Sequence, residues 1–191
     1  MEIDLDYTAL LVIDAIDSVS EGEDTVYANE LSPEMAAFRS NVAEVVELAH
    51  ENGIPVLFCN DEHIEGLDQE LDLWGPHGIK GKTCIFPEIA VEDYDLVIPK
   101  RRYSAFFQTD LDILLKELGV NTVIMTGLHA HMCVRHTSAD AFQLGYNVVV
   151  AKEATDSFTE QDYLYGLDYL KICYGADAYT NDELIAAFKA L

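Results

Sequence analysis

The sequence contains few basic residues. It has 11 lysines and arginines against 35 aspartates and glutamates, which gives a formal net charge of −24. A surface of this charge repels phosphate groups, so the composition excludes nucleic acids and anionic membranes as partners. The acids are spread along the chain instead of forming a tail, which predicts a uniformly acidic, well-hydrated surface.

Long apolar runs and closely spaced cysteines are also missing. No run reaches the roughly 18 apolar residues that a membrane helix requires. The first residues, MEIDLDY, carry acids where a secretory signal would carry lysine or arginine, so we expect a cytoplasmic protein. The four cysteines are Cys59, Cys84, Cys133 and Cys173. They form no CxxC pair, which favours free thiols over a disulfide framework.

Internal repeats, low-complexity tracts and Pro/Gly/Ser linkers are absent as well. Half of the 191 residues are apolar, which is enough for one sizeable core. Two full domains would need a longer chain. We therefore predict a single domain over residues 1–191.

Buried strands alternate with helices along the chain. Continuous apolar runs predict strands at residues 7–16, 54–60, 95–100, 121–127 and 146–154, and a short strand after residue 175. Capping residues and apolar stripes predict helices at residues 32–53, 109–119, 159–175 and 181–191, and one that includes residues 138–145. Residues 61–87 read as irregular. This alternation predicts a Rossmann-like, three-layer α/β/α sandwich around a mainly parallel sheet of five or six strands.

Polar residues follow four of the predicted strands. Asp14 follows the first strand, NDEH the second, Lys100 the third and GLHAHMC the fourth. Sites in open α/β sheets lie beyond the carboxyl ends of the strands. An acid, an acid–histidine pair, a lysine and a cysteine are therefore expected to converge on one edge of the sheet.

Cys133 is the candidate nucleophile at this edge. It stands at or near the start of a predicted helix, where the partial positive charge lowers the pKa of a thiol. A nearby Lys100 would lower it further, and Asp14 could take and return a proton. The backbone N–H groups of LHAHMC could face a developing oxyanion. The alternative is that Cys133 is a small buried apolar residue, which is the commoner role of a cysteine.

Asp61, His63 and His77 form a candidate metal site. Asp61 and His63 alternate along an extended segment, so their side chains point to the same side. Two imidazoles and a carboxylate suit zinc, iron or manganese, and Glu70 is a candidate fourth ligand. The alternative is a solvated acidic loop with two incidental histidines.

Several further side chains could contact a substrate. His129, His131 and His136 are better suited to hydrogen bonds with the backbone or a substrate than to metal binding. Trp74 and Phe106 are candidate walls for an aromatic substrate, although aromatic side chains more often serve packing.

Three blocks of sequence resemble the isochorismatase-like cysteine hydrolases, a superfamily that includes nicotinamidases and N-carbamoylsarcosine amidase. The blocks are ALLVIDAID, VIPKRRYSAFFQTDLDILL and VIMTGLHAHMCVRHTSADAFQLGYNVVVAKEATDSF. They fall in the family's order, and the resemblance covers nearly the whole chain. It implies the same α/β fold and a cysteine amidohydrolase with no organic cofactor.

The resemblance implies roles for the residues at the strand ends. Asp14, Lys100 and Cys133 match the family's catalytic triad, in which the cysteine attacks a carbonyl and forms a thioester. The family's non-proline cis peptide falls between Leu128 and His129. It would direct the N–H groups of His129 and Cys133 towards the oxyanion.

The resemblance also implies a metal site. Asp61, His63 and His77 match the nicotinamidase ligands, with Glu70 fitting a variant that uses an additional glutamate. The metal, zinc before iron or manganese, would hold the ring nitrogen of the substrate and a water molecule. Family members commonly form dimers or tetramers, so a homo-oligomer is expected.

Departures from the nicotinamidase pattern bear on the substrate. Val19 stands where nicotinamidases often have an aromatic residue, and Glu62 where they often have tryptophan. The short metal loop and WGPHGIKG look more like the carbamoyl amidases. We predict a small amide substrate, nicotinamide first and an N-carbamoyl or ureido compound second. A catalytically silent member that acts as a binding module is the alternative outside enzymes.

Overall fold

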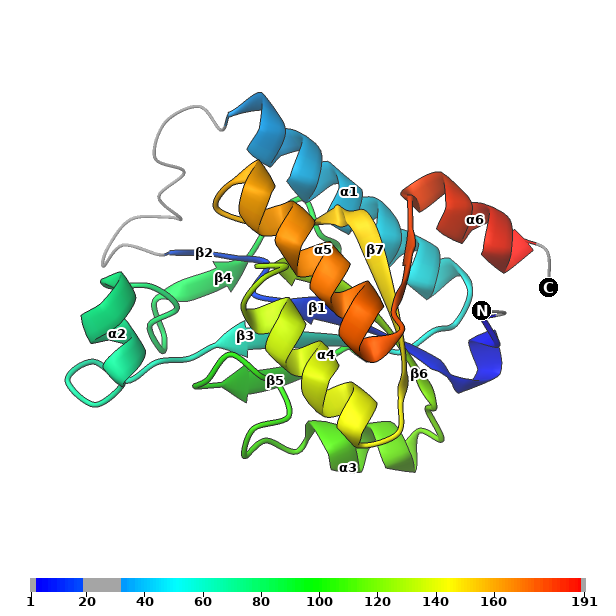
Figure 1. Ribbon diagram of the computed structural model, residues 1–191. Coiled ribbons are helices and arrows are strands. Elements are labelled where there is room, and N and C mark those ends of the chain that lie inside the picture. Colours follow the sequence, from blue (N-terminus) through cyan, green and yellow to red (C-terminus); the bar gives the residue numbers. More distant parts are fainter. Residues whose placement is uncertain (1–2, 19–31, 190–191) are drawn as a thin grey trace.

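The computed structural model describes residues 3–18 and 32–189 (Figure 1). Six strands form the central sheet in the order β5-β3-β1-β6-β7-β8, and every neighbouring pair is parallel. The strands are β1 (Thr8–Ile13), β3 (Val56–Asp61), β5 (Leu96–Lys100), β6 (Thr122–Leu128), β7 (Asn147–Asp156) and β8 (Asp177–Tyr179). The predicted parallel sheet is confirmed, with the larger of the two expected strand numbers.

The inner strands are apolar because helices cover both of their faces. All residues of β1 and β3 are buried. β1 lies between β3 and β6, with Leu10 opposite Val56 on one side and Ile124 on the other. A strand buried on both faces needs a continuous apolar run, and the sequence has that pattern.

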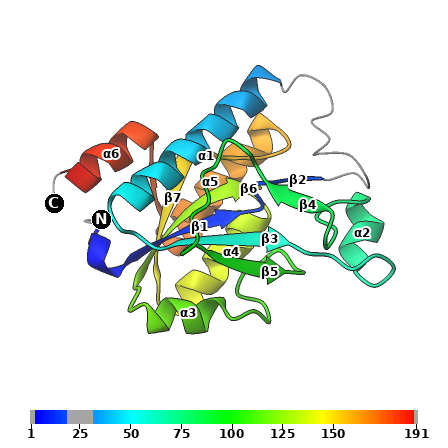
Figure 2. The ribbon, with the colours of Figure 1, turned by 180° about the vertical axis from the view of Figure 1, so that it is seen from behind.

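In the described parts of the chain, five helices flank the sheet, and Figure 2 shows them from behind. They are α1 (Pro33–Glu51), α3 (Leu111–Glu117), α4 (Cys133–Gln143), α5 (Glu160–Tyr174) and α6 (Asn181–Lys189). Apolar side chains of α1 and α6 form one core with the sheet, and those of α3, α4 and α5 form the other. The predicted three-layer α/β/α sandwich is confirmed.

The helix ends follow the capping residues of the sequence. Ser32 Oγ accepts a hydrogen bond from the Met35 N–H at 3.2 Å, just before Pro33 opens α1. Thr159 Oγ1 accepts from the Asp162 N–H at the start of α5 at 3.1 Å. Gly175 ends α5 in the left-handed region, with a φ of 64°. Serine, threonine and glycine at these positions stabilise the free backbone groups of helix ends.

The segments around the carboxyl edge of the sheet differ from the prediction. The first strand does not continue to residue 16, because Asp14 has a φ of 49° and breaks it. The chain then forms β2 (Ile16–Ser18), which pairs antiparallel with β4 (Thr83–Ile85). Residues 61–87 are not wholly irregular, because they also contain α2 (Gln69–Trp74). These elements are too short to show a helical or strand period in the sequence.

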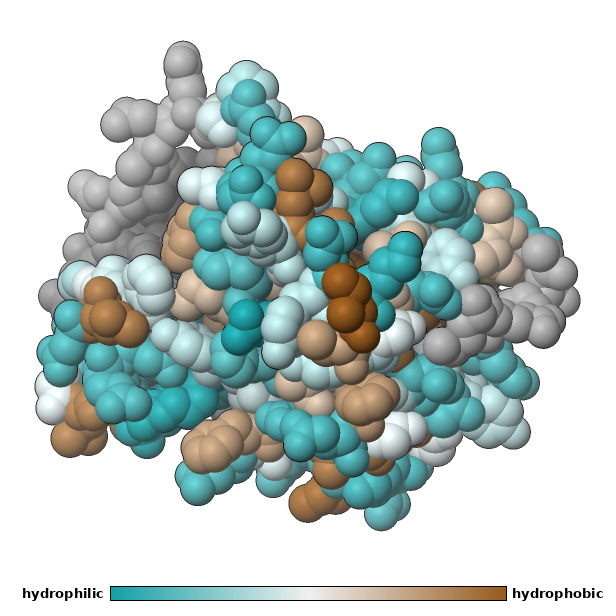
Figure 3. Space-filling view, in the orientation of Figure 1, coloured by the Kyte–Doolittle hydropathy of each residue, from teal (hydrophilic) through white to brown (hydrophobic). Residues whose placement is uncertain are grey.

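The surface is mainly hydrophilic, with separate hydrophobic patches on the face shown in Figure 3. Within residues 3–18 and 32–189, none of the helices is both long and apolar enough to cross a bilayer. Residues 1–2, 19–31 and 190–191 lie outside the described parts of the chain, so the single domain over residues 1–191 stays a prediction.

Candidate active site

Four neighbouring strands bring the site residues to one edge of the sheet. Lys100 is the last residue of β5 and lies opposite Asp61, the last residue of β3. Asp14 follows β1, whose last residue, Ile13, lies opposite Gly127 of β6. Because these strands are adjacent and parallel, their carboxyl ends place the polar residues together, as the strand-end rule predicts.

Lys100 is the centre of the cluster. Its Nζ lies 2.7 Å from Asp14 Oδ2 and 2.5 Å from Asp61 Oδ1. The same ammonium group donates to Cys133 Sγ at 3.6 Å. Lys100 is only 1% exposed, and Cys133 is 6% exposed. The three residues predicted as a triad therefore meet at one buried point, with Asp61 as a fourth member.

The backbone holds Asp14 in place. Its own N–H donates to the Cys59 carbonyl at 3.1 Å, and its Oδ1 accepts the Asp61 N–H at 2.8 Å. Its left-handed backbone turns the chain out of β1 directly at the carboxylate. The carboxylate is thus fixed between the ends of β1 and β3, beside the ammonium group.

Burial and charge set the ionisation of the cluster. Burial, and then the Asp61 carboxylate, raise the pKa of the Asp14 carboxyl to about 6. Burial alone would lower the pKa of the Lys100 ammonium. The charges of the Asp14 and Asp61 carboxylates outweigh burial and raise that pKa well above its ordinary value. Lys100 is therefore a permanent cation.

The Cys133 thiol is protonated in the free protein. Burial raises its pKa well above the ordinary value, and the attraction of Lys100 is offset by Asp14 and Asp61. The prediction that α4 and Lys100 together lower this pKa is wrong, because burial of the thiol outweighs the attraction of Lys100, which the two carboxylates also offset. Asp14 lies within 4.8 Å of Cys133 Sγ and can accept the thiol proton.

The turn between β6 and α4 carries the candidate oxyanion site. The peptide bond between Leu128 and His129 is cis, and Cys133 is the first residue of α4. Across the described parts of the chain, no hydrogen bond has the N–H of His129 or Cys133 as its donor. Two N–H groups next to the thiol are therefore free to donate to a substrate oxygen.

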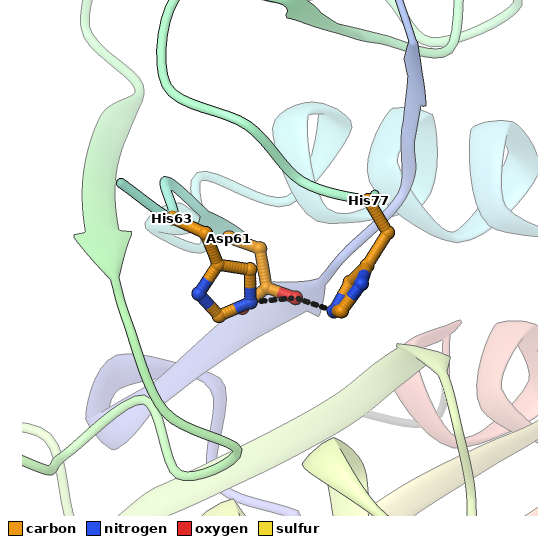
Figure 4. Close-up of side chains that lie close together, drawn as sticks. All are labelled: Asp61, His63 and His77. Atoms are coloured by element: carbon orange, nitrogen blue, oxygen red, sulfur yellow. Dashed lines mark ion pairs between the residues drawn. The ribbon is translucent and has the colours of Figure 1, made fainter. Parts of the chain in front are cut away.

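Asp61, His63 and His77 converge beside this cluster (Figure 4). Asp61 Oδ2 lies 3.4 Å from His63 Nε2 and 4.0 Å from His77 Nε2, so both rings face its second oxygen. His77 Nδ1 lies 2.8 Å from the Gly75 carbonyl, which leaves Nε2 as a lone-pair donor.

The donor set fits a transition-metal ion. His63 is fully buried, and neither of its ring nitrogens has a hydrogen-bond partner. A buried imidazole without partners is costly unless something else binds its nitrogen. Glu70 Oε2 lies 3.7 Å from His63 Nε2, at the border of the group. The two imidazoles and one or two carboxylates are a zinc-type ligand set.

Asp68 supports the segment that carries His63. This buried carboxylate accepts hydrogen bonds from Arg101, Arg102 and the Ile64 N–H. One of its oxygens also lies 3.8 Å from His63 Nδ1. Its Arg101 hydrogen bonds hold the pKa of the Asp68 carboxyl well below its ordinary value. Sequence reasoning missed Asp68, because its arginine partners lie more than 30 residues away.

A cavity of about 430 Å³ opens onto Cys133. Trp74, Tyr103, His129 and Phe158 supply aromatic walls, and Trp74 Nε1 donates to the Tyr103 hydroxyl at 2.9 Å. The Phe158 ring centroid lies 4.0 Å from that of His129 and 5.8 Å from that of Trp74. A cavity of this size and lining suits a small flat molecule.

The comparisons with known proteins identify the family. The model of the isochorismatase domain matches residues 8–183. The chain belongs to the isochorismatase family. The predicted resemblance is therefore confirmed over most of the chain.

Solved relatives in the isochorismatase family share this fold. N-carbamoylsarcosine amidase from Thermoplasma acidophilum is 33% identical, with a TM-score of 0.79 over 92% of this chain and 97% of its own. Pyrazinamidase/nicotinamidase from Streptococcus mutans is 32% identical, with a TM-score of 0.78 over 90% of this chain and 99% of its own. A relative from Arabidopsis thaliana, described as a probable inactive nicotinamidase, is 36% identical over 81% of this chain and 83% of its own. The family thus contains amidases and members described as inactive.

The predicted pocket residues of this family member divide into two groups. Trp74 and His129 line the cavity. Phe106 does not, because its ring stacks on Tyr146 at 5.8 Å in the core under α3 and α4. His131 does not line it either, because its Nδ1 lies 3.0 Å from Ser157 Oγ behind the turn. Val19 lies outside the described residues.

Two aromatic walls of the family site were missed from the sequence. Tyr103 belongs to the recognised block around Lys100, and its position three residues after the lysine could have suggested it. Phe158 follows β7 and enters the cavity from the loop before α5. Its place after a strand, at the end of the third block that resembles the family, could have suggested it.

Proposed function

We propose that this isochorismatase-family protein is a cysteine amidohydrolase that cleaves the C–N bond of a small amide. Nicotinamide is the preferred candidate substrate. One observation carries the proposal. The buried Lys100 ammonium lies 2.7 Å from Asp14 and 3.6 Å from the Cys133 sulfur, at the floor of the cavity. Nucleophile, proton acceptor and charge partner are thus assembled together.

The first half of the reaction transfers the acyl group to sulfur. Asp14 accepts the proton of the Cys133 thiol while the sulfur attacks the amide carbon. The carbonyl oxygen becomes an oxyanion, which the N–H groups of His129 and Cys133 stabilise. Asp14 then returns the proton to the nitrogen, the C–N bond breaks, and ammonia leaves a thioester on Cys133.

The second half releases the acid. Asp14, now ionised again, takes a proton from a water molecule that attacks the thioester carbon. The C–S bond breaks, and the proton returns to the Cys133 sulfur. Lys100 stays charged throughout, so it stabilises the thiolate each time the sulfur becomes an anion.

The charge of the cavity favours a neutral substrate. Asp14, Asp17, Asp61 and Glu70 line it, and the described lining residues include no lysine or arginine. Asp17 is held by the buried Arg39, and Lys100 lies beneath the floor against Asp14 and Asp61. An anionic substrate would meet carboxylates without a free cation, whereas nicotinamide is uncharged and flat.

We also propose a divalent transition metal, zinc before iron or manganese, on Asp61, His63 and His77, with Glu70 next to them. The unpartnered, buried His63 nitrogens support this site. Such a metal would bind the ring nitrogen of the substrate and a water molecule, so that the amide faces Cys133. Protein purified without chelator should contain close to one transition metal per chain. A metal-free protein with full activity would contradict the site.

Ammonia release tests the enzyme proposal. Wild-type protein should release ammonia from nicotinamide and carry a nicotinoyl adduct by mass spectrometry, whereas Cys133→Ala should do neither. Cys173→Ala is the matched control, because Cys173 is an exposed thiol on α5 and should keep full activity. If Cys133→Ala releases as much ammonia as wild type, the mechanism is wrong.

An N-carbamoyl or ureido amidohydrolase is the second candidate. The similarity to N-carbamoylsarcosine amidase favours it. N-carbamoyl amino acids carry a carboxylate, so the acidic cavity argues against them. A panel of nicotinamide, pyrazinamide and N-carbamoyl amino acids, each assayed with and without chelator, separates the two. A protein that binds these amides and hydrolyses none would be a silent binding module.

We further propose that the chain forms a homo-oligomer. Tyr165, Tyr169 and Ile172 recur along α5 at one face of the helix, and Ile172 is 79% exposed. A second copy covering this face would yield a dimer, or a tetramer if a further face is used. Light scattering should report a dimer or tetramer for wild type and a monomer for Ile172→Lys. A monomeric wild type would contradict the proposal.

The cytoplasmic location also stays a proposal. All four cysteines are free, which suits a reducing compartment. Cell fractionation with an antibody against the protein would test it.

A further inference from the structure

The turn that carries His129 and Cys133 rests on a glycine of α5. Gly166 is buried in the middle of this helix, where glycine is unfavourable because it loses more backbone freedom than other residues. A Cβ added to it would lie 2.6 Å from the Ala130 carbonyl carbon and 2.7 Å from the His131 nitrogen. Both are backbone atoms of the turn, so neither can rotate away as a flexible side chain would.

The same side of the turn has two further supports. The Ala130 N–H donates to the Asp156 carbonyl at the end of β7 at 2.9 Å. His131 Nδ1 lies 3.0 Å from Ser157 Oγ, directly after β7. The back of the turn is therefore held by the segment that leads into α5 and by α5 itself. The front of the turn presents the N–H groups of His129 and Cys133 to the cavity.

We propose that Gly166 is a positioning residue for the oxyanion site. Because Gly166 has no side chain, the turn that carries His129 and Cys133 packs directly on α5, and this packing fixes the position of the turn. The inference rests on the proposed cysteine mechanism. Gly166 touches neither substrate nor sulfur, and it acts through the Ala130–His131 peptide. Any larger residue pushes this peptide towards the cavity.

The expected effect is on the reaction and not on substrate binding. A side chain at position 166 would move the turn by about 1 Å, which is enough to misplace the oxyanion donors. Removing one such donor slows related enzymes by roughly 10²- to 10³-fold, so a displaced pair should cost about 10- to 100-fold in kcat. The ground-state carbonyl depends less on these donors, so KM should change less than about threefold.

The test compares Gly166→Ala with Gly175→Ala. Gly175 ends the same helix with a φ of 64°, and a Cβ there meets no atom within 4 Å. Both variants should lower the thermal midpoint, but only Gly166→Ala should lower kcat. Equal kcat values for the two variants and wild type would overturn the proposal.

An aldehyde analogue provides a readout without turnover. Pyridine-3-carbaldehyde can add to Cys133: the S–C bond forms, Asp14 takes the thiol proton, and the electron pair of the C=O π bond leaves an oxyanion on the aldehyde oxygen. This tetrahedral adduct needs the oxyanion donors, whereas bound nicotinate does not. Gly166→Ala should weaken aldehyde binding about 10- to 100-fold and nicotinate binding less than about threefold. Equal weakening of both ligands would overturn the proposal.

The outcomes separate the two proposals. If wild type hydrolyses no amide but its Cys133 still binds the aldehyde, the proposed function fails and the aldehyde comparison still tests Gly166. Where Gly166→Ala does not fold at 10 °C, the double variant Ala130→Gly/Gly166→Ala, which removes a contact of 2.8 Å to the Ala130 Cβ, is measured instead. If the double variant also stays unfolded, Gly166 serves folding alone and the proposal is overturned.

Discussion

Two parts of the active site are held in different ways. Asp14, Lys100 and Cys133 stand at the ends of neighbouring strands, and each has a charged or hydrogen-bonded partner within the group. His63 and His77 stand in the segment between β3 and β4, where carboxylates lie 3.4–4.0 Å from their ring nitrogens, farther than the 2.5–2.7 Å between Lys100 and its carboxylates. The sheet and the start of α4 position the first group, whereas the proposed metal ion would complete the second.

This difference separates catalysis from substrate orientation. Charge balance within the strand-end group depends on residues of the sheet alone. In the proposed reaction, the loop histidines and the aromatic walls instead select the amide and orient it towards the thiol. Substitutions in the two parts should therefore have different kinetic signatures.

The largest effect is expected from Lys100→Met, which breaks the strand-end group. It leaves two carboxylates near the sulfur without their cation, so activity should fall by on the order of 10³-fold or more. The free energy of unfolding should fall by about 3–5 kcal/mol, since a buried ion pair loses one partner. Amide hydrolysis and thermal unfolding measure the two effects.

Lys116→Met is the control for this variant. Lys116 pairs with Asp112 on the exposed surface of α3, so its loss should leave activity unchanged. A Lys100→Met protein with more than a tenth of wild-type activity would show that the strand-end group does not need the ammonium.

His63→Asn should come next, because it breaks the loop group alone. Metal affinity should fall at least about 100-fold, because the variant loses a metal ligand itself. Losing only a hydrogen bond to a metal ligand costs about 10- to 100-fold. Competition with a chelating dye measures this. His50→Asn is the control. His50 contacts Asp95 and not the candidate metal site, so this variant should bind metal as wild type does. Unchanged metal affinity in His63→Asn would refute the ligand assignment.

The pH dependence of kcat/KM tests the role of Asp14 as the proton acceptor. Its raised pKa of about 6 means that the carboxyl is ionised above this pH and protonated below it. Because Asp14 must accept the thiol proton, kcat/KM should be highest above pH 6 and fall about tenfold from pH 7 to pH 5. Stopped assays between pH 4.5 and pH 8 measure the profile, and fluorescence at each pH checks that the fold persists. A flat profile to pH 5 would exclude Asp14 as the proton acceptor.

The smallest effect is expected from Phe158→Ala, which removes one aromatic wall of the cavity. The loss of one ring contact should raise KM about 3- to 10-fold and leave kcat within about twofold. Phe142→Ala is the control, because Phe142 is equally exposed but packs on Tyr174 away from the cavity. A fall in kcat without a change in KM would contradict the assignment of Phe158 to substrate binding.

The strand-borne part of the site could be predicted from the sequence. β1, β3, β5 and β6 are short apolar runs. A site residue ends β3 and β5, directly follows β1, and comes five residues after β6. Parallel pairing then requires these ends to lie together, so Asp14, Lys100 and Cys133 needed no knowledge of distances. The raised pKa of the thiol could not be predicted in this way, because it depends first on how deeply Cys133 is buried and then on Asp61 as a second carboxylate at the ammonium.

The loop-borne part could be predicted only in outline. In the segment after Lys100 the chain bends without a repeating period, so the sequence does not say which of its aromatic rings faces the cavity. Tyr103 does, whereas Phe106 packs on Tyr146 in the core. Phe158 is brought to the cavity by the crossover from β7 to α5, which no local pattern encodes.

Asp61 belongs to both parts, because one of its oxygens meets Lys100 and the other faces the two histidines. A chelator and an Asp61 substitution are therefore not equivalent experiments. The chelator would withdraw the proposed metal ion and leave the Lys100 ammonium balanced, whereas the substitution also removes one of the two counter-charges of Lys100. An Asp61 variant that loses activity thus cannot by itself assign the loss to metal or to thiol chemistry.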